Sequence, residues 1–225
     1  MTAIFVTGTG TDVGKTFITA ALCRYLRADG RPVDAIKPVA SGFEPDLPQA
    51  SDPGALVAAL ERPVTLEEID RISPWRFAAP LSPDMAAARE GRTVDFKALV
   101  TFCRTAADAC RGTLFIEGVG GVMVPLDESH TVLDWMNAVR APAIVVAGSY
   151  LGTISHTLTA LHVLAQRNLD IAAVVVSESE MPGAPLDETV AAIARFARPI
   201  DVVGVPRLGA DAGKHAAIAR IAQLL

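Results

Sequence analysis

"GTGTDVGKT", residues 8–16, lies between a short hydrophobic run (3–6) and a stretch with helical periodicity (16–27). A glycine-rich turn between a strand and a helix lets backbone N–H groups surround an anion, and the helix N-terminus adds positive potential. The ending Gly14-Lys15-Thr16 matches a phosphate-binding loop, in which the lysine reaches the β- and γ-phosphates and the hydroxyl binds Mg²⁺. The common motif has four residues before Gly-Lys-[Ser/Thr]. Here five residues separate Gly8 from Gly14, so the segment predicts a nucleoside triphosphate site with unusual spacing.

The rest of the chain alternates β-rich runs with Ala- and Leu-rich runs of helical period. Strands are expected at 4–6, 33–39, 114–116, 143–146, 172–176 and 202–205. Helices are expected at 16–27, 52–60, 96–110, 132–139, 154–166 and 189–196, and from 214 onward, whereas residues 62–92, interrupted by four prolines, are expected to be irregular. Strand runs that are hydrophobic on both faces are typical of a parallel sheet covered by helices. We therefore predict one α/β domain, residues 1–225, with a doubly wound, mainly parallel sheet.

Composition excludes several classes of protein. Hydrophobic residues make up 51% of the chain, which suits a large core, and the net charge of −5 argues against a nucleic-acid surface. The three cysteines are odd in number and lack CxxC spacing, which argues against a disulfide framework or a zinc site. The N-terminus does not resemble a signal peptide, and no hydrophobic run approaches the about 20 residues of a membrane span. A cytoplasmic protein that does not bind membranes is expected.

Charged and polar residues follow the predicted strands, at the edge where doubly wound sheets bind their ligands. Lys37 and Ser41 occur in "KPVASG", where the lysine is either a functional group or a solvated charge. Asp52 is either a metal-supporting carboxylate or only a helix N-cap. Glu117 in "FIEGVGG" directly follows a strand that should be buried, the place where a carboxylate supports Mg²⁺ in many phosphate-loop proteins.

The segment "GSYLGTISHT", residues 148–157, runs from a strand end into a helix start. Its free N–H groups suit a carboxylate, or Thr153 and Ser155 simply cap the helix, and the sequence leaves both readings open. The four histidines lack the spacing of a helical metal pair, so we interpret them as structural or solvated.

Taken together, these segments resemble the dethiobiotin synthetase family. The matching stretches are "VTGTGTDVGKT", "KPVASG", Ser51-Asp52, "FAAPLSP" with "AREGR", "IEGVGGVMVPL" and "LGTISHT", in family order over most of the chain. The longer loop spacing is a feature of that family. The resemblance implies a homodimer of the P-loop NTPase class that closes a ring from 7,8-diaminononanoate and CO₂ to give dethiobiotin, ADP and phosphate. ATP and Mg²⁺ are required, and the reaction passes through a carbamate and a carbamic-phosphoric anhydride.

The resemblance also implies residue roles. Lys15 and Lys37 would be catalytic, as fixed cations at the reacting phosphate, and Thr16, Asp52 and Glu117 would hold Mg²⁺. The implied nucleotide-binding residues are Thr11, Asp12, Val13, Gly14, Lys15, Thr16, Ser177 and Pro206. The implied substrate-binding residues are Lys37 and Ser41, with Gly152, Thr153 and Ser155 contributed by the second subunit to the tail carboxylate.

Four positions depart from the family pattern. Asp12 replaces a frequent glutamate, Val119 a usual alanine and Ser155 a usual asparagine. Ser177 stands where many members have an asparagine that reads adenine, and a hydroxyl cannot supply an amide's paired donor and acceptor. The base preference is therefore left open between ATP and other nucleoside triphosphates.

The alternative function is a partitioning-type ATPase whose dimerisation is switched by nucleotide. Such proteins carry a second lysine in the loop, and the equivalent position here is Gly10. A corrinoid-amidating ligase would need an added glutamine amidotransferase domain, for which 225 residues leave no room. A nucleotide-binding module without catalysis would not need the lysine and two acids expected at the strand ends.

Overall fold

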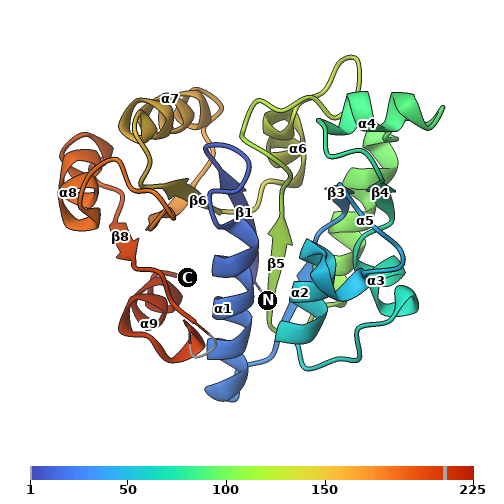
Figure 1. The fold of residues 1–225 in the computed structure, drawn as a ribbon, viewed down its shortest axis with the longest axis horizontal. Helices are drawn as coiled ribbons and strands as arrows, with labels where there is room; N and C mark the ends of the chain where they lie inside the picture. Colours follow the sequence, from blue (N-terminus) through green and yellow to red (C-terminus); the bar gives the residue numbers. More distant parts are fainter. Residues whose placement is uncertain (1, 210–211) are drawn as a thin grey trace.

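A computed structural model describes residues 2–209 and 212–225. Its main sheet is parallel throughout, with the strand order β2-β5-β1-β6-β7-β8. Helices surround this sheet (Figure 1): α1 packs against α2 and α9, α5 against α6, and α7 against α8. The strands are β1 (Thr2–Gly8), β2 (Val33–Ile36), β5 (Thr113–Glu117), β6 (Ala143–Gly148), β7 (Ile171–Ser177) and β8 (Val202–Val205). The prediction of a doubly wound α/β fold is confirmed.

The helices of the main layers begin and end close to where periodicity places them. They are α1 (Lys15–Ala28), α2 (Asp52–Ala59), α5 (Phe96–Ala109), α6 (Val132–Val139), α7 (Thr153–Gln166), α8 (Leu186–Ala197) and α9 (Ala216–Gln223). Short 3₁₀ turns, Pro48–Ala50 and Ala212–Lys214, precede α2 and α9. Within the described ranges, no helix is both long enough and hydrophobic enough to cross a membrane.

The expected strand 33–39 is wrong as a single element. The chain leaves the main sheet after Ile36, and Val39–Ser41 forms β3 in a separate two-stranded parallel sheet with β4 (Trp75–Phe77). Pro38 has no N–H to donate, so it cannot continue a central ladder. The N–H of Lys37 donates instead to the carbonyl of Ile72 (3.1 Å).

The expectation that residues 62–92 are irregular is also wrong. This segment contains α3 (Leu66–Ile72), β4 and α4 (Pro83–Arg89), which lie together on the right of Figure 1. Thr65 caps α3 by accepting from the N–H of Glu68 (3.2 Å), and Pro83 is the first residue of α4. Proline is favoured at a helix's first position, so Pro83 marks a helix start and does not interrupt the segment.

The strand order determines which residues meet. In β5, Ile116 pairs with Phe5 of β1 on one side and with Ile36 of β2 on the other. The next residues along each strand therefore emerge side by side at the carboxyl edge, with Glu117 in the middle and Lys37 beside it. Behind this edge, Phe5 packs edge-on against Trp135 of α6, with ring centroids 4.8 Å apart.

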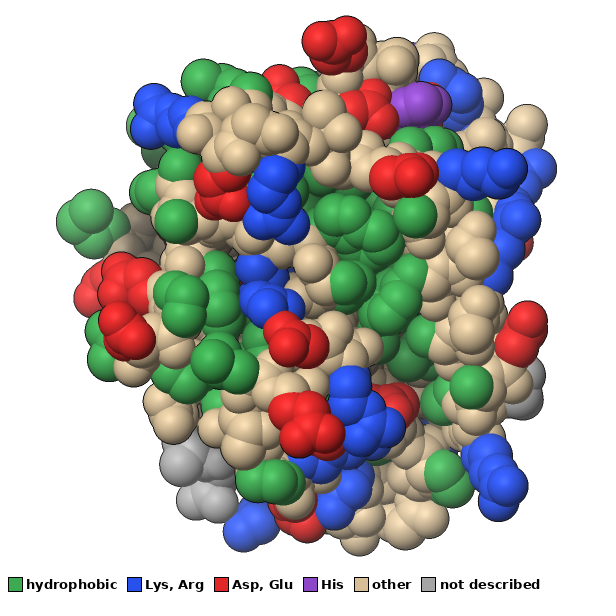
Figure 2. All heavy atoms as spheres, turned by 90° about the vertical axis from the view of Figure 1, so that its right-hand side faces the viewer, with side chains coloured by type: hydrophobic (Ala, Val, Ile, Leu, Met, Phe, Trp, Pro, Cys, Tyr) green, Lys and Arg blue, Asp and Glu red, His purple; other side chains and the backbone are tan. Residues whose placement is uncertain are grey.

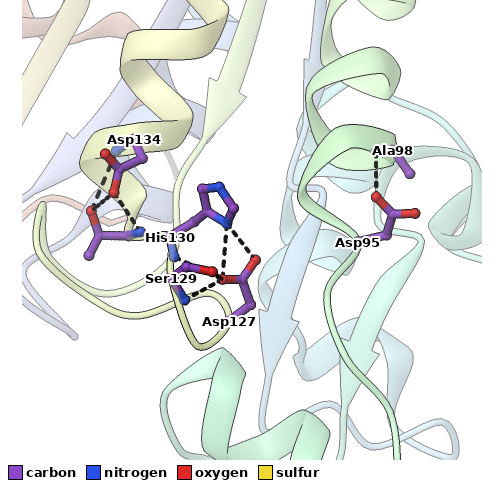
Figure 3. A network of polar contacts seen from close by, with 7 residues as sticks. Asp95, Ala98, Asp127, Ser129, His130 and Asp134 are labelled. Atoms are coloured by element: carbon purple, nitrogen blue, oxygen red, sulfur yellow. Dashed lines mark hydrogen bonds and ion pairs between the residues drawn. The ribbon is translucent and has the colours of Figure 1, made fainter.

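The loop between β5 and α6 is fixed by polar contacts (Figure 3). The ring Nδ1 of His130 lies 2.9 and 3.0 Å from the two carboxylate oxygens of Asp127, and the ring stacks on Phe96 at 3.8 Å. Thr131 and Asp134 form a reciprocal capping box at the start of α6. His130 therefore serves to hold a turn, in agreement with its interpretation as structural.

Candidate active site

The loop of residues 8–16 connects β1 to α1, as predicted. Gly14 is the N-cap of α1 and has φ = 95°, a conformation that favours glycine, and Asp12 also has positive φ (56°). A Cβ added to Gly14 would lie 2.7 Å from the hydroxyl oxygen of Ser177, at the end of β7. The glycine is therefore required both by the backbone turn and by the closeness of β7.

Lys15 begins α1 and is buried, and its Nζ donates to the carbonyl of Gly10 (2.6 Å) across the loop. Burial, together with the nearby charge of Lys37, lowers the pKa of Lys15 from 10.5 to about 8. The ammonium group thus lies inside the loop, where it has lost much of its hydration. A bound anion would again favour its protonated form.

Lys37 is the centre of the predicted site. Its Nζ lies 2.6 Å from Oε1 of Glu117 and 2.7 Å from Oδ2 of Asp52, and the lysine is 3% exposed. Burial alone would lower the pKa of Lys37, but the charges of Glu117 and Asp52 outweigh burial and raise it. Lys37 is therefore held as a cation, and it is not the solvated surface charge that the sequence left as an alternative.

The two carboxylates reach Lys37 from different elements. Glu117 ends β5 and is fully buried, and its Oε1 also accepts from the hydroxyl of Thr16 (2.5 Å). Asp52 is the first residue of α2, whose N-cap is Ser51, with its hydroxyl accepting from the N–H of Gly54 (3.1 Å). Capping by Ser51 leaves the Asp52 carboxylate available to Lys37. Burial opposes ionisation of Asp52, but Lys37 keeps the pKa of Asp52 lowered.

The arrangement fits a magnesium ion that is held partly by phosphate. Oε2 of Glu117 is buried and has no hydrogen-bond partner in the described part of the chain, so a ligand atom of the kind Mg²⁺ prefers is left over. Thr16 and Asp52 lie beside it. Among residues 2–209 and 212–225, no group of three or more His, Cys, Asp or Glu side chains could hold a metal unaided. Mg²⁺ is commonly bound by one or two carboxylates together with substrate phosphates, and the carboxylates of Glu117 and Asp52 would supply the protein's share of such a site.

A cleft of about 730 Å³ opens in front of these groups. Its lining brings together Thr11, Asp12, Gly14, Lys15, Thr16, Lys37, Ser41 and Asp52, and it also includes Phe43 and residues 80–83. The hydroxyl oxygen of Ser41 is buried and has no hydrogen-bond partner within the described ranges, so it is available to a bound molecule.

A second cavity, of about 340 Å³, lies on the other side of the phosphate loop and shares Asp12, Gly14 and Phe17 with the first. Val13, Ser177 and Pro206 line it, together with Glu178, Ser179, Glu180, Arg207 and Leu208. The predicted nucleotide-binding residues are therefore divided between two adjoining cavities.

Gly152, Thr153 and Ser155 line neither cavity. Gly152 and Ser155 are exposed at the start of α7, whereas Thr153 is buried and its hydroxyl donates to the carbonyl of Gly148 (2.6 Å). Within this chain, these three residues are not brought to the lysines.

Comparison with known proteins agrees with this geometry. A family model described as an AAA domain matches residues 2–210. The ATP-dependent dethiobiotin synthetase BioD of Methylobacterium nodulans is 55% identical over 205 residues, which cover 88% of this chain and 90% of the relative. That of Caulobacter vibrioides is 48% identical over 217 residues, covering 95% and 96%. This chain belongs to the dethiobiotin synthetase family. The predicted family, and with it the enzyme class, are confirmed.

Solved structures that resemble this dethiobiotin synthetase family member are distant in sequence. Hydrogenase maturation factor HypB from Archaeoglobus fulgidus is 11% identical, with a TM-score of 0.55 and coverage of 100% of this chain and 91% of that chain. A chain of the MinC:MinD cell division protein complex from Aquifex aeolicus is 13% identical, with a TM-score of 0.54 and coverage of 100% and 94%. These likenesses concern the fold alone, and they agree with the doubly wound α/β architecture described above.

Sequence reasoning missed part of the site of this dethiobiotin synthetase family member. Phe43 and residues 80–83 form part of the wall of the main cleft, and Glu178 and Arg207 line the second cavity. The stretch "FAAPLSP" carried a signal for that wall, because closely spaced prolines indicate a loop with a restricted backbone conformation. No residue pattern identified Phe43, which depends on the unexpected pairing of β3 with β4.

Proposed function

We propose that this chain catalyses the ATP- and Mg²⁺-dependent ring closure of 7,8-diaminononanoate with CO₂ to dethiobiotin, releasing ADP and phosphate. The relatives are named ATP-dependent dethiobiotin synthetases, which supports the overall reaction. One observation carries the proposal: the ammonium group of Lys37 is buried between two carboxylates at the mouth of a phosphate loop.

The chemistry has three steps. An amine of the substrate adds to CO₂ and loses a proton, which gives a carbamate. A carbamate oxygen then attacks the γ-phosphorus and breaks its bond to ADP, which gives a carbamic-phosphoric anhydride. The neighbouring amine attacks the carbonyl carbon, expels phosphate, loses a proton and closes the ureido ring.

The residues act mainly by charge. Negative charge gathers where the carbamate meets the γ-phosphate, and cations fixed in a water-poor site stabilise such charge most effectively. Lys37 remains protonated because Glu117 and Asp52 raise its pKa, and the ammonium group of Lys15 lies inside the phosphate loop, where it donates to the carbonyl of Gly10. Both lysines are proposed as catalytic residues in this electrostatic sense, and neither has to act as a nucleophile.

Thr16, Asp52 and Glu117 would hold Mg²⁺, with the free Oε2 of Glu117 as the strongest support. When bound, the ion would neutralise charge on the β- and γ-phosphates. Thr11, Asp12 and the loop N–H groups would contact phosphate oxygens, and Val13, Ser177 and Pro206 would face the base. Because Ser177 offers one hydroxyl and no amide, CTP and GTP should be compared with ATP.

The substrate's tail carboxylate is proposed to reach a second copy of this chain, at Gly152, Thr153 and Ser155 of the partner subunit. Two hydrophobic side chains near the start of α7 support a homodimer, since Leu151 is 90% exposed and Met181 is 86% exposed. The segments that carry Leu151 and Met181 lie side by side, because a Cβ added to Gly183 would lie 2.6 Å from the backbone N of Leu151. Exposed hydrophobic side chains that gather at one place mark interaction sites.

The test is phosphate release measured with each reactant omitted in turn. We expect release to require both bicarbonate and 7,8-diaminononanoate, with ATP, CTP and GTP run in parallel to set the base preference. Steady hydrolysis without the diamine, unchanged when the diamine is added, would instead favour the partitioning-type ATPase.

A further inference from the structure

The part of the main cleft lined by Ser41, Phe43 and residues 80–83, called the substrate wall below, depends on the small sheet. β3 pairs with β4 so that Ser41 lies opposite Phe77. Beyond β3, the N–H of Phe43 donates to the carbonyl of Phe77 (3.0 Å), and that of Gly42 to the carbonyl of Ala79 (3.2 Å). Ser41 and Phe43, which both line the cleft, are therefore positioned by pairing with a strand from elsewhere in the sequence.

Arg76 of β4 fixes the ring on that wall. Its guanidinium lies over the Phe43 ring, 4.8 Å from the centroid, and Phe43 is 5% exposed. The same guanidinium donates to the carbonyl of Ser73 and to the carboxylate of Asp70, which orient its plane. Its Nε is buried and has no hydrogen-bond partner among residues 2–209 and 212–225, and the contact with the ring adds to the attraction that the Asp70 carboxylate supplies.

A second pair repeats the arrangement behind the first. The guanidinium of Arg92 lies 4.8 Å from the centroid of Phe77 and donates to the carbonyl of Arg76 (3.0 Å) and the carboxylate of Glu90 (2.9 Å). Figure 2 faces the side of the molecule where α3, α4 and β4 lie, and it shows Lys and Arg side chains beside Asp and Glu side chains around a hydrophobic band. Two arginine–phenylalanine contacts, Arg76 with Phe43 and Arg92 with Phe77, therefore pack against the small sheet.

We propose that Arg76 is a positioning residue for the substrate wall: through the Phe43 ring, it holds Ser41 in place for the diamine and CO₂. The identity of the substrate rests on the proposed function, whereas the coupling of Arg76 to the wall does not. Arg76 does not line the cleft, so it acts through Phe43 and does not touch the substrate. A cation over a ring within about 6 Å is attracted to it, more strongly where water is excluded.

The test is a double-mutant cycle with Arg76→Met and Phe43→Leu. We expect Arg76→Met alone to raise the KM for the diamine roughly tenfold, equivalent to about 1.4 kcal/mol, with the KM for nucleotide nearly unchanged. In the Phe43→Leu background, the same replacement should change the diamine KM by less than about twofold, because its contact is already gone. An unchanged diamine KM, or equal effects in both backgrounds, would overturn the proposal.

Arg71→Met is the matched control. Arg71 is an exposed arginine of α3 that pairs with Glu68 (2.9 Å), and a surface pair of this kind contributes little. Hydrogen exchange of the Gly42 and Phe43 amides gives a readout that needs no substrate. We expect exchange to be faster in Arg76→Met and parental in Arg71→Met, and parental exchange in both would refute the positioning role. If the parent fails to consume the diamine, the proposed function fails, while exchange still decides the role of Arg76.

Discussion

Replacement of Lys37 by methionine removes the cation and keeps most of the stem. The lysine Nζ lies within 2.7 Å of two carboxylates, one of them fully buried. Loss of one preorganised group that stabilises developing charge lowers kcat by about 10²–10³, or about 2.7–4 kcal/mol. We therefore expect Lys37→Met to form product at least about a hundredfold more slowly. Nucleotide affinity should change little, because Lys15 and the loop are intact.

The same replacement leaves Glu117 without its main partner. Breaking a buried ion pair on one side costs about 3–5 kcal/mol, which is comparable with the catalytic loss but within the stability of an average domain. Turnover must therefore be measured well below the variant's melting temperature, with nucleotide binding by calorimetry as evidence of folding. Lys97→Met, at an exposed position of α5, is the control. If Lys37→Met turns over within about threefold of the parent, Lys37 does not stabilise the developing charge, and the electrostatic role proposed for it is refuted.

Other groups of the site give further expectations. Glu117→Gln should raise the Mg²⁺ concentration for half-maximal activity, because the free Oε2 supplies a carboxylate ligand; an unchanged requirement in a metal titration would remove Glu117 from the metal site. The pKa of Lys15 is lowered to about 8, and a bound triphosphate should raise it again. Nucleotide affinity should therefore fall as pH rises from about 7 to about 9, and binding above about pH 8 should take up a proton. Calorimetry in buffers of different ionisation enthalpy would reveal that uptake, and its absence would contradict the assignment.

The meeting of the loop, Lys37 and Glu117 follows from sequence because parallel strands all present their carboxyl ends at one edge. Once β5 lies between β1 and β2, Glu117 has to emerge beside Lys37. The role of Asp52 was harder to predict from the sequence, since Ser51 and Asp52 are both good N-caps. Only the folded geometry shows that Ser51 takes the cap and leaves Asp52 to Lys37.

The substrate wall could not be derived in this way. Pairing of β3 with β4 joins short segments that are distant in sequence, and three-residue strands carry almost no periodicity. The expected strand 33–39 runs through Pro38, which instead marks a change of sheet, and Pro83, expected to interrupt regular structure, instead begins a helix. The contact between Arg76 and Phe43 is a consequence of that pairing, so it became visible only with the fold.

The most direct test of the proposed chemistry follows an oxygen atom. Carbamate oxygen is proposed to attack the γ-phosphorus and to leave with it, so bicarbonate labelled with heavy oxygen should transfer one labelled atom to each phosphate released. Mass spectrometry of phosphate, in reactions shorter than the exchange of bicarbonate with water, should show label in proportion to dethiobiotin formed. Unlabelled phosphate, released at the same rate as product, would contradict the carbamic-phosphoric anhydride and the charge arrangement proposed around Lys15 and Lys37.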